Sequence, residues 1–392
     1  MKRFLSLLAA ALFFLASPAS GEEFSVAAED SLIHEALVRG DTAEAASLLL
    51  GQMTRREKVL QLFMVTPDML SGRTPTCAYS ESLEAGFLSS PVGGILFFGQ
   101  NIASGDDLLD MNERLSSLSV RTSGVGAFLA ITEEGGDVSP LSLKLGLETL
   151  PPSAYLNAGN AAEQGEKLAA RLLSYGFNLD FCPCADLFAD EGNAEIGERA
   201  YSWDAYAAAD CASLISGALE RGGVVSVYKH FPGIGSVPDA LTRRGRGTIP
   251  ENLAEMRARS LIPYLAAVAQ GCAMIQVSAM DSAAIDPGIP CCLSPAVIQM
   301  LRGELGYQGV IVSDSMRSAL ITEKYGAGAA AVAALSAGCD LILLPEDLPK
   351  AVEAVLTALS DGRLTESRID ASVQRILEVK LRFGLYKDAY AE

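Results

Sequence analysis

Eight short apolar runs, each followed by a segment with helical periodicity, constrain the fold of this 392-residue chain more than any other feature. The runs cover 62–66, 93–98, 127–132, 178–183, 224–229, 272–278, 309–314 and 340–344. Continuous apolar runs that alternate with helices are typical of parallel strands buried on both faces. A doubly wound open sheet is the structural alternative, but it more often has fewer strands. We therefore predict an α/β fold with a single (β/α)8 TIM barrel.

Helices are expected to mark both ends of this barrel. Thr54, with Glu57 three residues later, has the pattern of a capping box, so we expect a helix to begin there. The last helix is expected near 365–383, and its apolar residues would close the barrel. Those residues are Ile369, Val373, Ile376, Leu377 and Val379.

The N-terminus is typical of a secretory signal. Lys2 and Arg3 precede an apolar stretch that ends in small residues and is short for a membrane span. A retained N-terminal anchor is the alternative interpretation. We expect an exported protein, periplasmic or secreted, with no later membrane span. The predicted organisation is a signal peptide over 1–20, a helical segment over 21–52, the barrel domain over 53–386 and a C-terminal tail over 387–392.

The charge balance excludes two classes of partner. Asp and Glu total 48 against 30 Lys and Arg, which gives a formal net charge of −18. A surface this acidic repels phosphate backbones and anionic lipid headgroups. We therefore expect no nucleic acid and no membrane surface as a partner, and no pattern in the sequence indicates an oligomeric state.

Eight cysteines would permit disulfides in an oxidising compartment, but most lie in apolar runs, where a cysteine usually packs as a small hydrophobe. The chain has only two histidines, His34 and His230, and its cysteines lack the spacing of a zinc site. There is also no phosphate-binding loop. We expect no metal and no cofactor.

Polar residues follow several predicted strands, at the end where barrel enzymes place their chemistry. They are Glu133, Glu134, Asp186, Lys229, His230 and Asp314. Carboxylates, a lysine and a histidine that converge on one mouth suit a polyhydroxylated ligand. Asp314 would then attack or stabilise an electron-poor carbon.

A series of motifs over about residues 53–386 resembles glycoside hydrolase family 3. The motifs begin with Met53-Thr54 and Glu57-Lys58-Val59 and continue with Gly93-Gly94-Ile95-Leu96-Phe97, Glu134-Gly135-Gly136, Gly197-Glu198-Arg199-Ala200-Tyr201, Lys229-His230-Phe231-Pro232-Gly233, Val312-Ser313-Asp314 and Gly338-Cys339-Asp340. The length of the chain resembles the single-domain β-N-acetylhexosaminidase branch of that family.

The resemblance implies a role for each matching residue. Asp314 would be the nucleophile of a retaining mechanism, which forms a covalent glycosyl-enzyme. Arg199, Lys229 and His230 would hydrogen-bond the sugar in the terminal subsite, and Asp186 would support them. A retaining mechanism also needs a proton donor about 5–5.5 Å from the nucleophile.

That proton donor is where the sequence departs from the branch. The loop after K-H-F-P-G normally ends in an Asp-His pair that supplies the general acid/base. Here Ile234 and either Leu241 or Thr242 occupy the histidine positions of the loop. Asp239 lies in the same loop and is our candidate substitute, with a glutamate from elsewhere in the chain as the alternative.

A second departure follows the third predicted strand. The family pattern D-Q-E-G-G-R reads Thr132-Glu133-Glu134-Gly135-Gly136-Asp137 here. Thr132 therefore replaces the aspartate that hydrogen-bonds the sugar hydroxyls in the family. Glu133 is the candidate to take over this part of substrate binding.

Three functions follow from these residues. The first is an exported glycosidase that resembles retaining exo-β-N-acetylglucosaminidases and acts on carbohydrate or peptidoglycan fragments. The second is a catalytically impaired relative that binds carbohydrate. The third is a transferase or phosphorylase-like variant with an anionic acceptor, for which the arginines within 243–246 would be the clamp unless they form a solvated turn. Because a binding protein has no need of Asp314, we predict a hydrolase.

Overall fold

Eight parallel strands close into a barrel in the computed structural model, which describes residues 31–238 and 246–386. β1 pairs with both β2 and β11, and this pairing closes the ring. The barrel strands are β1 (Phe63–Val65), β2 (Gly94–Leu96), β3 (Phe128–Ile131), β4 (Leu179–Asp180), β5 (Val225–Phe231), β7 (Met274–Val277), β10 (Val310–Ser315) and β11 (Leu341–Leu343). Each predicted apolar run overlaps one of these strands, so the predicted TIM barrel is confirmed.

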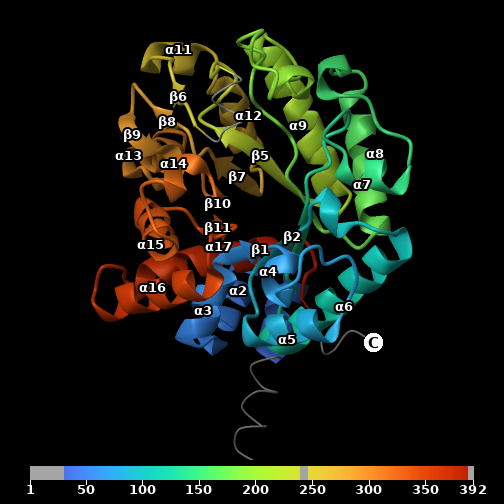
Figure 1. The fold of residues 1–392 in the computed structure, drawn as a ribbon, viewed down its shortest axis with the longest axis vertical. Coiled ribbons are helices and arrows are strands. Elements are labelled where there is room, and N and C mark those ends of the chain that lie inside the picture. The colour runs from blue at the N-terminus through green and yellow to red at the C-terminus, as the bar shows by residue number, and fades with distance from the viewer. Residues whose placement is uncertain (1–30, 239–245, 387–392) are drawn as a thin grey trace, which may run out of the picture.

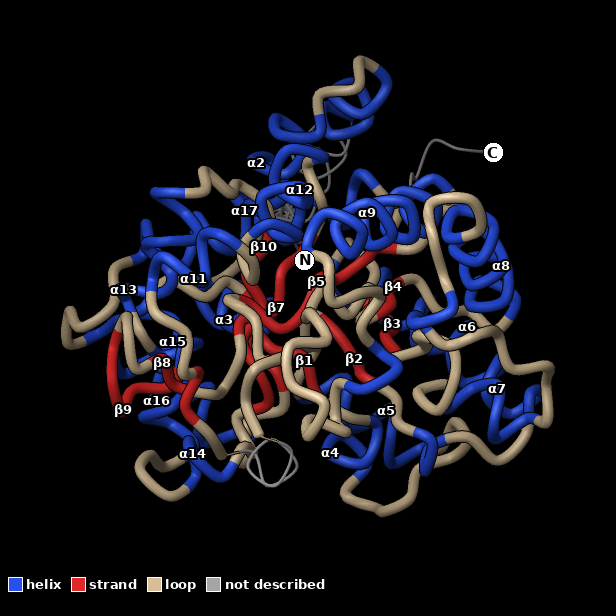
Figure 2. The backbone as a smooth tube through the Cα atoms, turned by 90° about the horizontal axis from the view of Figure 1, so that it is seen from above, coloured by secondary structure: helices blue, strands red, loops and turns tan. Residues whose placement is uncertain are grey.

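Helices surround the strands (Figure 1), which lie at the centre of the molecule (Figure 2). The longer helices are α2 (Thr42–Gln52), α5 (Glu81–Ser89), α6 (Gly105–Ser123), α8 (Ala161–Ser174), α9 (Ala205–Arg221), α12 (Ile262–Gln270), α15 (Ala327–Ala337), α16 (Leu348–Ser360) and α17 (Glu366–Arg382). The shorter ones are α3 (Arg55–Gln61), α4 (Pro67–Ser71), α7 (Pro140–Leu145), α11 (Leu253–Ala258), α13 (Pro295–Gln299) and α14 (Ala319–Thr322). A small separate sheet joins β6 (Thr248–Ile249), β8 (Asp281–Ser282) and β9 (Asp286–Pro290).

The predicted helix ends are present. The Thr54 hydroxyl accepts a hydrogen bond from the Glu57 backbone N–H, and the Glu57 carboxylate accepts one from the Thr54 N–H, so the capping box begins α3. The five apolar residues predicted for the last helix are all buried in α17. α17 also holds α2, because Gln374 donates to the Ala43 carbonyl at 2.9 Å.

The strands are buried on both faces, as continuous apolar runs predict. All residues of β1, β2, β3 and β11 are buried between the barrel interior and the helices. A Cβ at Gly94 would lie 2.6 Å from the terminal methyl of Met64, so the Met64 side chain would have to shift to accommodate it. None of the helices in the two described ranges is both long and apolar enough to cross a membrane.

All eight cysteines lie in the described part of the chain and all are free thiols. Seven are buried, as the apolar context of most of them predicts, and Cys77 is partly exposed. The predicted signal peptide, the C-terminal tail and Asp239 lie outside the described residues.

Candidate active site

A glycine turn after β3 places the central carboxylate of the site. Gly135 and Gly136 have φ values of 95° and 57°, which favour glycine. A Cβ at Gly135 would also lie 2.4 Å from the Pro151 carbonyl oxygen. The Glu134 N–H donates to the Val138 carbonyl at 2.7 Å across this turn, so the backbone of Glu134 is fixed.

Glu134 is buried and binds two cations from different strand ends. Arg199 donates to both of its carboxylate oxygens at 2.9 Å, and the Lys229 ammonium lies 2.5 Å from Oε1. Lys229 also donates to the Phe181 carbonyl. Burial alone would raise the pKa of Glu134, but the Arg199 and Lys229 charges lower this pKa to about 2. Glu134 is therefore a permanent anion that fixes both cations.

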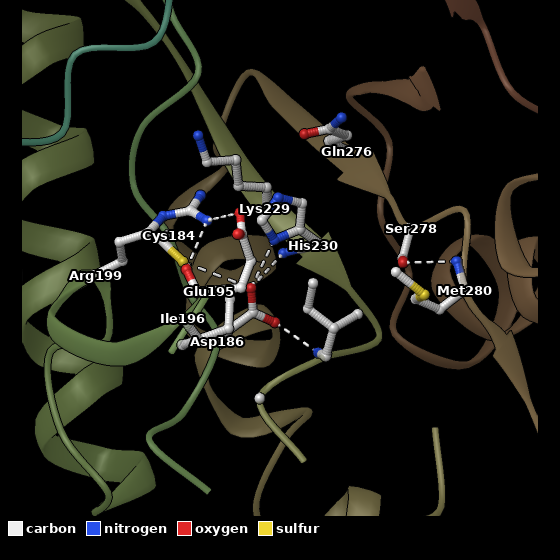
Figure 3. A network of polar contacts seen from close by, with 12 residues as sticks. Cys184, Asp186, Glu195, Ile196, Arg199, Lys229, His230, Gln276, Ser278 and Met280 are labelled. Atoms are coloured by element: carbon white, nitrogen blue, oxygen red, sulfur yellow. Dashed lines mark hydrogen bonds and ion pairs between the residues drawn. The ribbon is translucent and has the colours of Figure 1, made fainter. Parts of the chain in front are cut away.

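Asp186 organises the loop that follows β5. Its Oδ2 lies 2.7 Å from Nδ1 of His230 (Figure 3) and accepts from the His230 backbone N–H at 3.2 Å. Its Oδ1 accepts from the Ile234 N–H at 2.7 Å. Burial would raise the pKa of Asp186, but His230 and the Ile234 N–H hold it below its ordinary value. A Cβ at Gly235 would lie 1.9 Å from the Leu187 carbonyl, so glycine lets the two loops pack this closely.

Asp314 lies at the end of β10 and is held by its neighbour β7. Its Oδ2 accepts from the Ala279 N–H at 2.8 Å, and Oδ1 accepts from the Ser315 N–H at 2.7 Å. The Gln276 amide also donates to Oδ1, at 3.3 Å. These donors fix the carboxylate while leaving it partly exposed, as a nucleophile needs to be.

A cavity of about 300 Å³ brings three predicted residues together. Asp314, Arg199 and His230 all line it. The predicted residues Lys229 and Asp186 are buried next to this cavity, where they hold Glu134 and His230 respectively. The arrangement offers one carboxylate for attack and hydrogen-bond donors for the hydroxyls of a small polar ring.

Glu133 has a different position from the one expected for a substrate-binding residue. It is buried and does not line the cavity. Its carboxylate accepts from the backbone N–H groups of Leu141 and Ser142, at 2.9 and 3.1 Å, and from the Ser142 hydroxyl at 2.5 Å. Burial raises the pKa of Glu133, whereas those hydrogen bonds lower it, and burial has the larger effect. The physical reason for its position is the local chain path, which presents Glu134 to the cations and Glu133 to the start of α7.

Two carboxylates that the sequence reasoning did not assign belong to the site. The sequence feature that could have identified Glu134 is the pair of glycines that follow it. Glu195 lines the cavity with a side chain that is 42% exposed, and its carboxylate lies 3.4 Å from the Arg199 guanidinium. The only sequence signal for Glu195 is its position four residues before Arg199, just ahead of the motif that begins at Gly197.

One group in the described ranges brings metal-ligating atoms together. Ligand atoms of Cys184, Asp186 and His230 all lie within 4.8 Å of one another. They already serve one another as hydrogen-bond partners, since the Cys184 sulfur lies 3.5 Å from Asp186 Oδ2. Burial also raises the pKa of the Cys184 thiol, which opposes formation of the thiolate that metals bind. The donor set therefore fits a hydrogen-bond network better than a metal.

The fold and the cavity define a TIM-barrel enzyme with its chemistry at the carboxyl ends of the strands. Residues 54–379 match the family described as Glycosyl hydrolase family 3 N terminal domain. The chain therefore belongs to glycoside hydrolase family 3, and it is a glycoside hydrolase by class.

Similar proteins agree with this assignment. A beta-hexosaminidase from Methylococcus capsulatus is 33% identical over 71% of this chain and 83% of its own length. One from Stenotrophomonas maltophilia is 31% identical over 67% of this chain and 80% of its own. The solved family 3 beta-N-acetylglucosaminidase from Paenibacillus sp. has a TM-score of 0.79 at 31% identity, over 87% of this chain but only 64% of that one. The beta-N-acetylhexosaminidase from Beutenbergia cavernae has a TM-score of 0.74 at 25% identity, over 84% of this chain and 99% of its own.

Proposed function

We propose that the protein is a retaining exo-β-N-acetylglucosaminidase with Asp314 as its nucleophile. The observation that carries the proposal is the shared cavity in which the fixed Asp314 carboxylate lies with Arg199 and His230. A cavity of about 300 Å³ suits one terminal sugar, which favours an exo-acting enzyme. The names of the relatives, beta-hexosaminidase and beta-N-acetylglucosaminidase, support the sugar class. Carbohydrate or peptidoglycan fragments with this terminal sugar are the proposed substrates.

In the proposed reaction, each step is carried out by one of a few residues. Asp314 Oδ attacks the anomeric carbon and forms a C–O bond, while the leaving oxygen departs with a proton from the general acid. The conjugate base then takes a proton from water, which attacks the same carbon and releases Asp314. Arg199 and His230 hold the sugar hydroxyls, and Lys229 keeps Glu134 and thereby Arg199 in place.

We assign the proton transfers to one of two carboxylates. Glu195 lines the cavity that contains Asp314 and is exposed enough to exchange protons with water. Asp239 lies in the loop that carries the acid/base pair in the related branch. We take Glu195 as the first candidate, because it lines the same cavity as Asp314.

Two aryl glycosides test both assignments. The 2,4-dinitrophenolate group leaves with little protonation, whereas 4-nitrophenolate depends more on an acid. With the β-N-acetylglucosaminides of both, Asp314→Asn is expected to lose at least about 10³-fold in kcat/KM. Glu195→Gln is expected to slow the 4-nitrophenyl substrate by about 10²-fold and the dinitrophenyl substrate much less.

The matched variant Asp239→Asn separates the two candidates. If it shows the selective loss and Glu195→Gln does not, Asp239 is the acid. Added azide is expected to restore turnover of the true acid/base variant and to give a β-configured glycosyl azide, because azide attacks the glycosyl-enzyme without a base. If the Asp314→Asn protein releases nitrophenolate from either substrate as fast as the natural protein does, the proposed function is contradicted.

We also propose that the protein is exported, on the basis of its N-terminal segment. The test is the N-terminal sequence of the protein recovered from cell fractions. A chain that begins near residue 21 in the periplasm or medium supports cleavage. A chain that keeps residues 1–20 in the membrane fraction supports the anchor instead.

A further inference from the structure

A second cavity, of about 450 Å³, lies beside the candidate active-site cavity. We propose that it binds the leaving-group sugar of the substrate, an uncharged pyranose that stacks on Phe98. The inference rests on the proposed function, because it names the part of the substrate that departs when Asp314 attacks.

The two cavities meet at Arg317, which lines both. Arg317 lies three residues after Asp314, just beyond the end of β10. The second cavity is also lined by Thr66, Phe98 and Leu344, which follow β1, β2 and β11 respectively. Both cavities are therefore built at the carboxyl ends of the barrel strands and share one lining residue, which is the arrangement that a disaccharide spanning both requires.

Phe98 gives the second cavity an apolar surface of the kind that a sugar ring covers. Its side chain is 41% exposed, although Phe97 before it is buried and packs edge-on against Phe177 at a centroid distance of 5.4 Å. An exposed aromatic ring gains free energy when apolar C–H groups cover it. A pyranose presents such a C–H face together with hydroxyls at its edge, and it matches an aromatic surface that has polar groups around it.

The polar groups around Phe98 are fixed before any ligand binds. Asp68 accepts from the Thr76 N–H at 2.6 Å and from the Gln100 and Asn101 amides at 2.8 and 3.1 Å. Asp68 and Gln100 both line the cavity, so a held carboxylate and a held amide face the hydroxyls of a sugar. Polar and apolar groups contribute about equally to the lining, which suits a ring with an apolar face and hydroxyls at its edge.

The charge of the lining selects an uncharged sugar. Asp68, Glu346 and Asp347 bring three carboxylates to the cavity, and Arg317 is the single cation among the residues that line it. A carboxylate on the leaving sugar is therefore repelled. N-acetylglucosamine meets the requirement, and a muramic acid derivative with its free carboxylate does not.

Binding to the Asp314→Asn protein tests the proposal without turnover. Calorimetric titration compares N-acetylglucosamine, which fills one cavity, with its β-1,4-linked disaccharide, which reaches both. The disaccharide is expected to bind about tenfold more tightly, which corresponds to about 1.4 kcal/mol. Adding Phe98→Ala is expected to remove this difference and to leave the affinity for the monosaccharide unchanged.

Tyr206→Ala is the matched control, because Tyr206 is a 70% exposed aromatic that lines neither cavity. It is expected to change neither affinity. Equal affinity for the two sugars in the Asp314→Asn protein overturns the leaving-group cavity while leaving the proposed function intact. Binding of neither sugar overturns both. A disaccharide with a carboxylated second sugar that binds as tightly as the uncharged one overturns the charge selection.

Discussion

Arg199 holds Glu134 through two parallel hydrogen bonds of 2.9 Å, from Nε and Nη2 to the two carboxylate oxygens. The pair joins the turn after β3 to the loop after β4, and Lys229 adds the end of β5 to the same carboxylate. The guanidinium is therefore oriented before a sugar arrives. Its remaining Nη1 faces the Glu195 carboxylate at 3.4 Å, on the side of the cavity.

The paired geometry predicts that lysine cannot replace Arg199. Lysine is a point charge and cannot make both hydrogen bonds to Glu134 in one plane. We expect Arg199→Lys to lower kcat/KM by about 10²-fold, mainly through KM, because a misplaced donor weakens sugar binding. Steady-state kinetics on the 4-nitrophenyl substrate measures this. Arg56→Lys, in an exposed pair with Glu353, is the control and is expected to keep full activity.

The low pKa of Glu134 predicts a specific dependence of stability on pH. A folded pKa of about 2, below the ordinary 4.5, means that its stabilising effect is complete above about pH 4.5 and is lost as the pH falls toward 2. We expect Glu134→Gln to lose on the order of 3 kcal/mol at pH 7. Denaturant unfolding at pH 7 and at the lowest pH where both proteins fold measures the difference. A loss that does not shrink as the pH falls contradicts the assignment.

Lys380 predicts the opposite direction of pH dependence. It is fully buried, donates to Gln61 at 2.7 Å and lies 5.0 Å from the ring centroid of Phe128, and burial lowers its pKa to about 7. Between this value and the ordinary 10.5, the unfolded chain binds a proton that the folded chain does not, so stability rises with pH. Relative to Lys380→Met, the natural protein is expected to gain about 1.4 kcal/mol per pH unit from pH 7 to 9. Equal pH dependence of the two proteins would show that Lys380 stays charged.

The close contact at Gly135 predicts that alanine there affects both fold and activity. Alanine at Gly135 meets the Pro151 carbonyl oxygen at 2.4 Å, whereas alanine at Gly146 has a similar left-handed backbone but nothing within 4 Å. We expect Gly135→Ala to cost about 1–3 kcal/mol more than Gly146→Ala, because overpacking adds to the shared backbone strain. Thermal unfolding compares the two. The Gly135 variant alone is expected to lose activity, because the turn positions Glu134.

Most of the barrel could be predicted because its signal is local. A strand buried on both faces must be apolar along its length, and this pattern is visible at each of the eight runs. Asp314, Lys229 and His230 directly end such runs, so their arrival at one mouth follows from the topology. Asp186 follows the fourth run and is expected at the same mouth, whereas Arg199 lies in a loop and only motif resemblance identifies it.

Glu133 and Glu134 show what the sequence alone determined and what the tertiary structure decided. The sequence put two carboxylates and two glycines after the third strand, and hence at the mouth of the barrel. The turn then buried Glu134 between Arg199 and Lys229, where its pKa falls, and buried Glu133 against backbone N–H groups of α7, where its pKa rises. Adjacent residues of the same type differ because Glu134 meets the charges of Arg199 and Lys229, which only the closed barrel brings to it, whereas burial has the larger effect on Glu133.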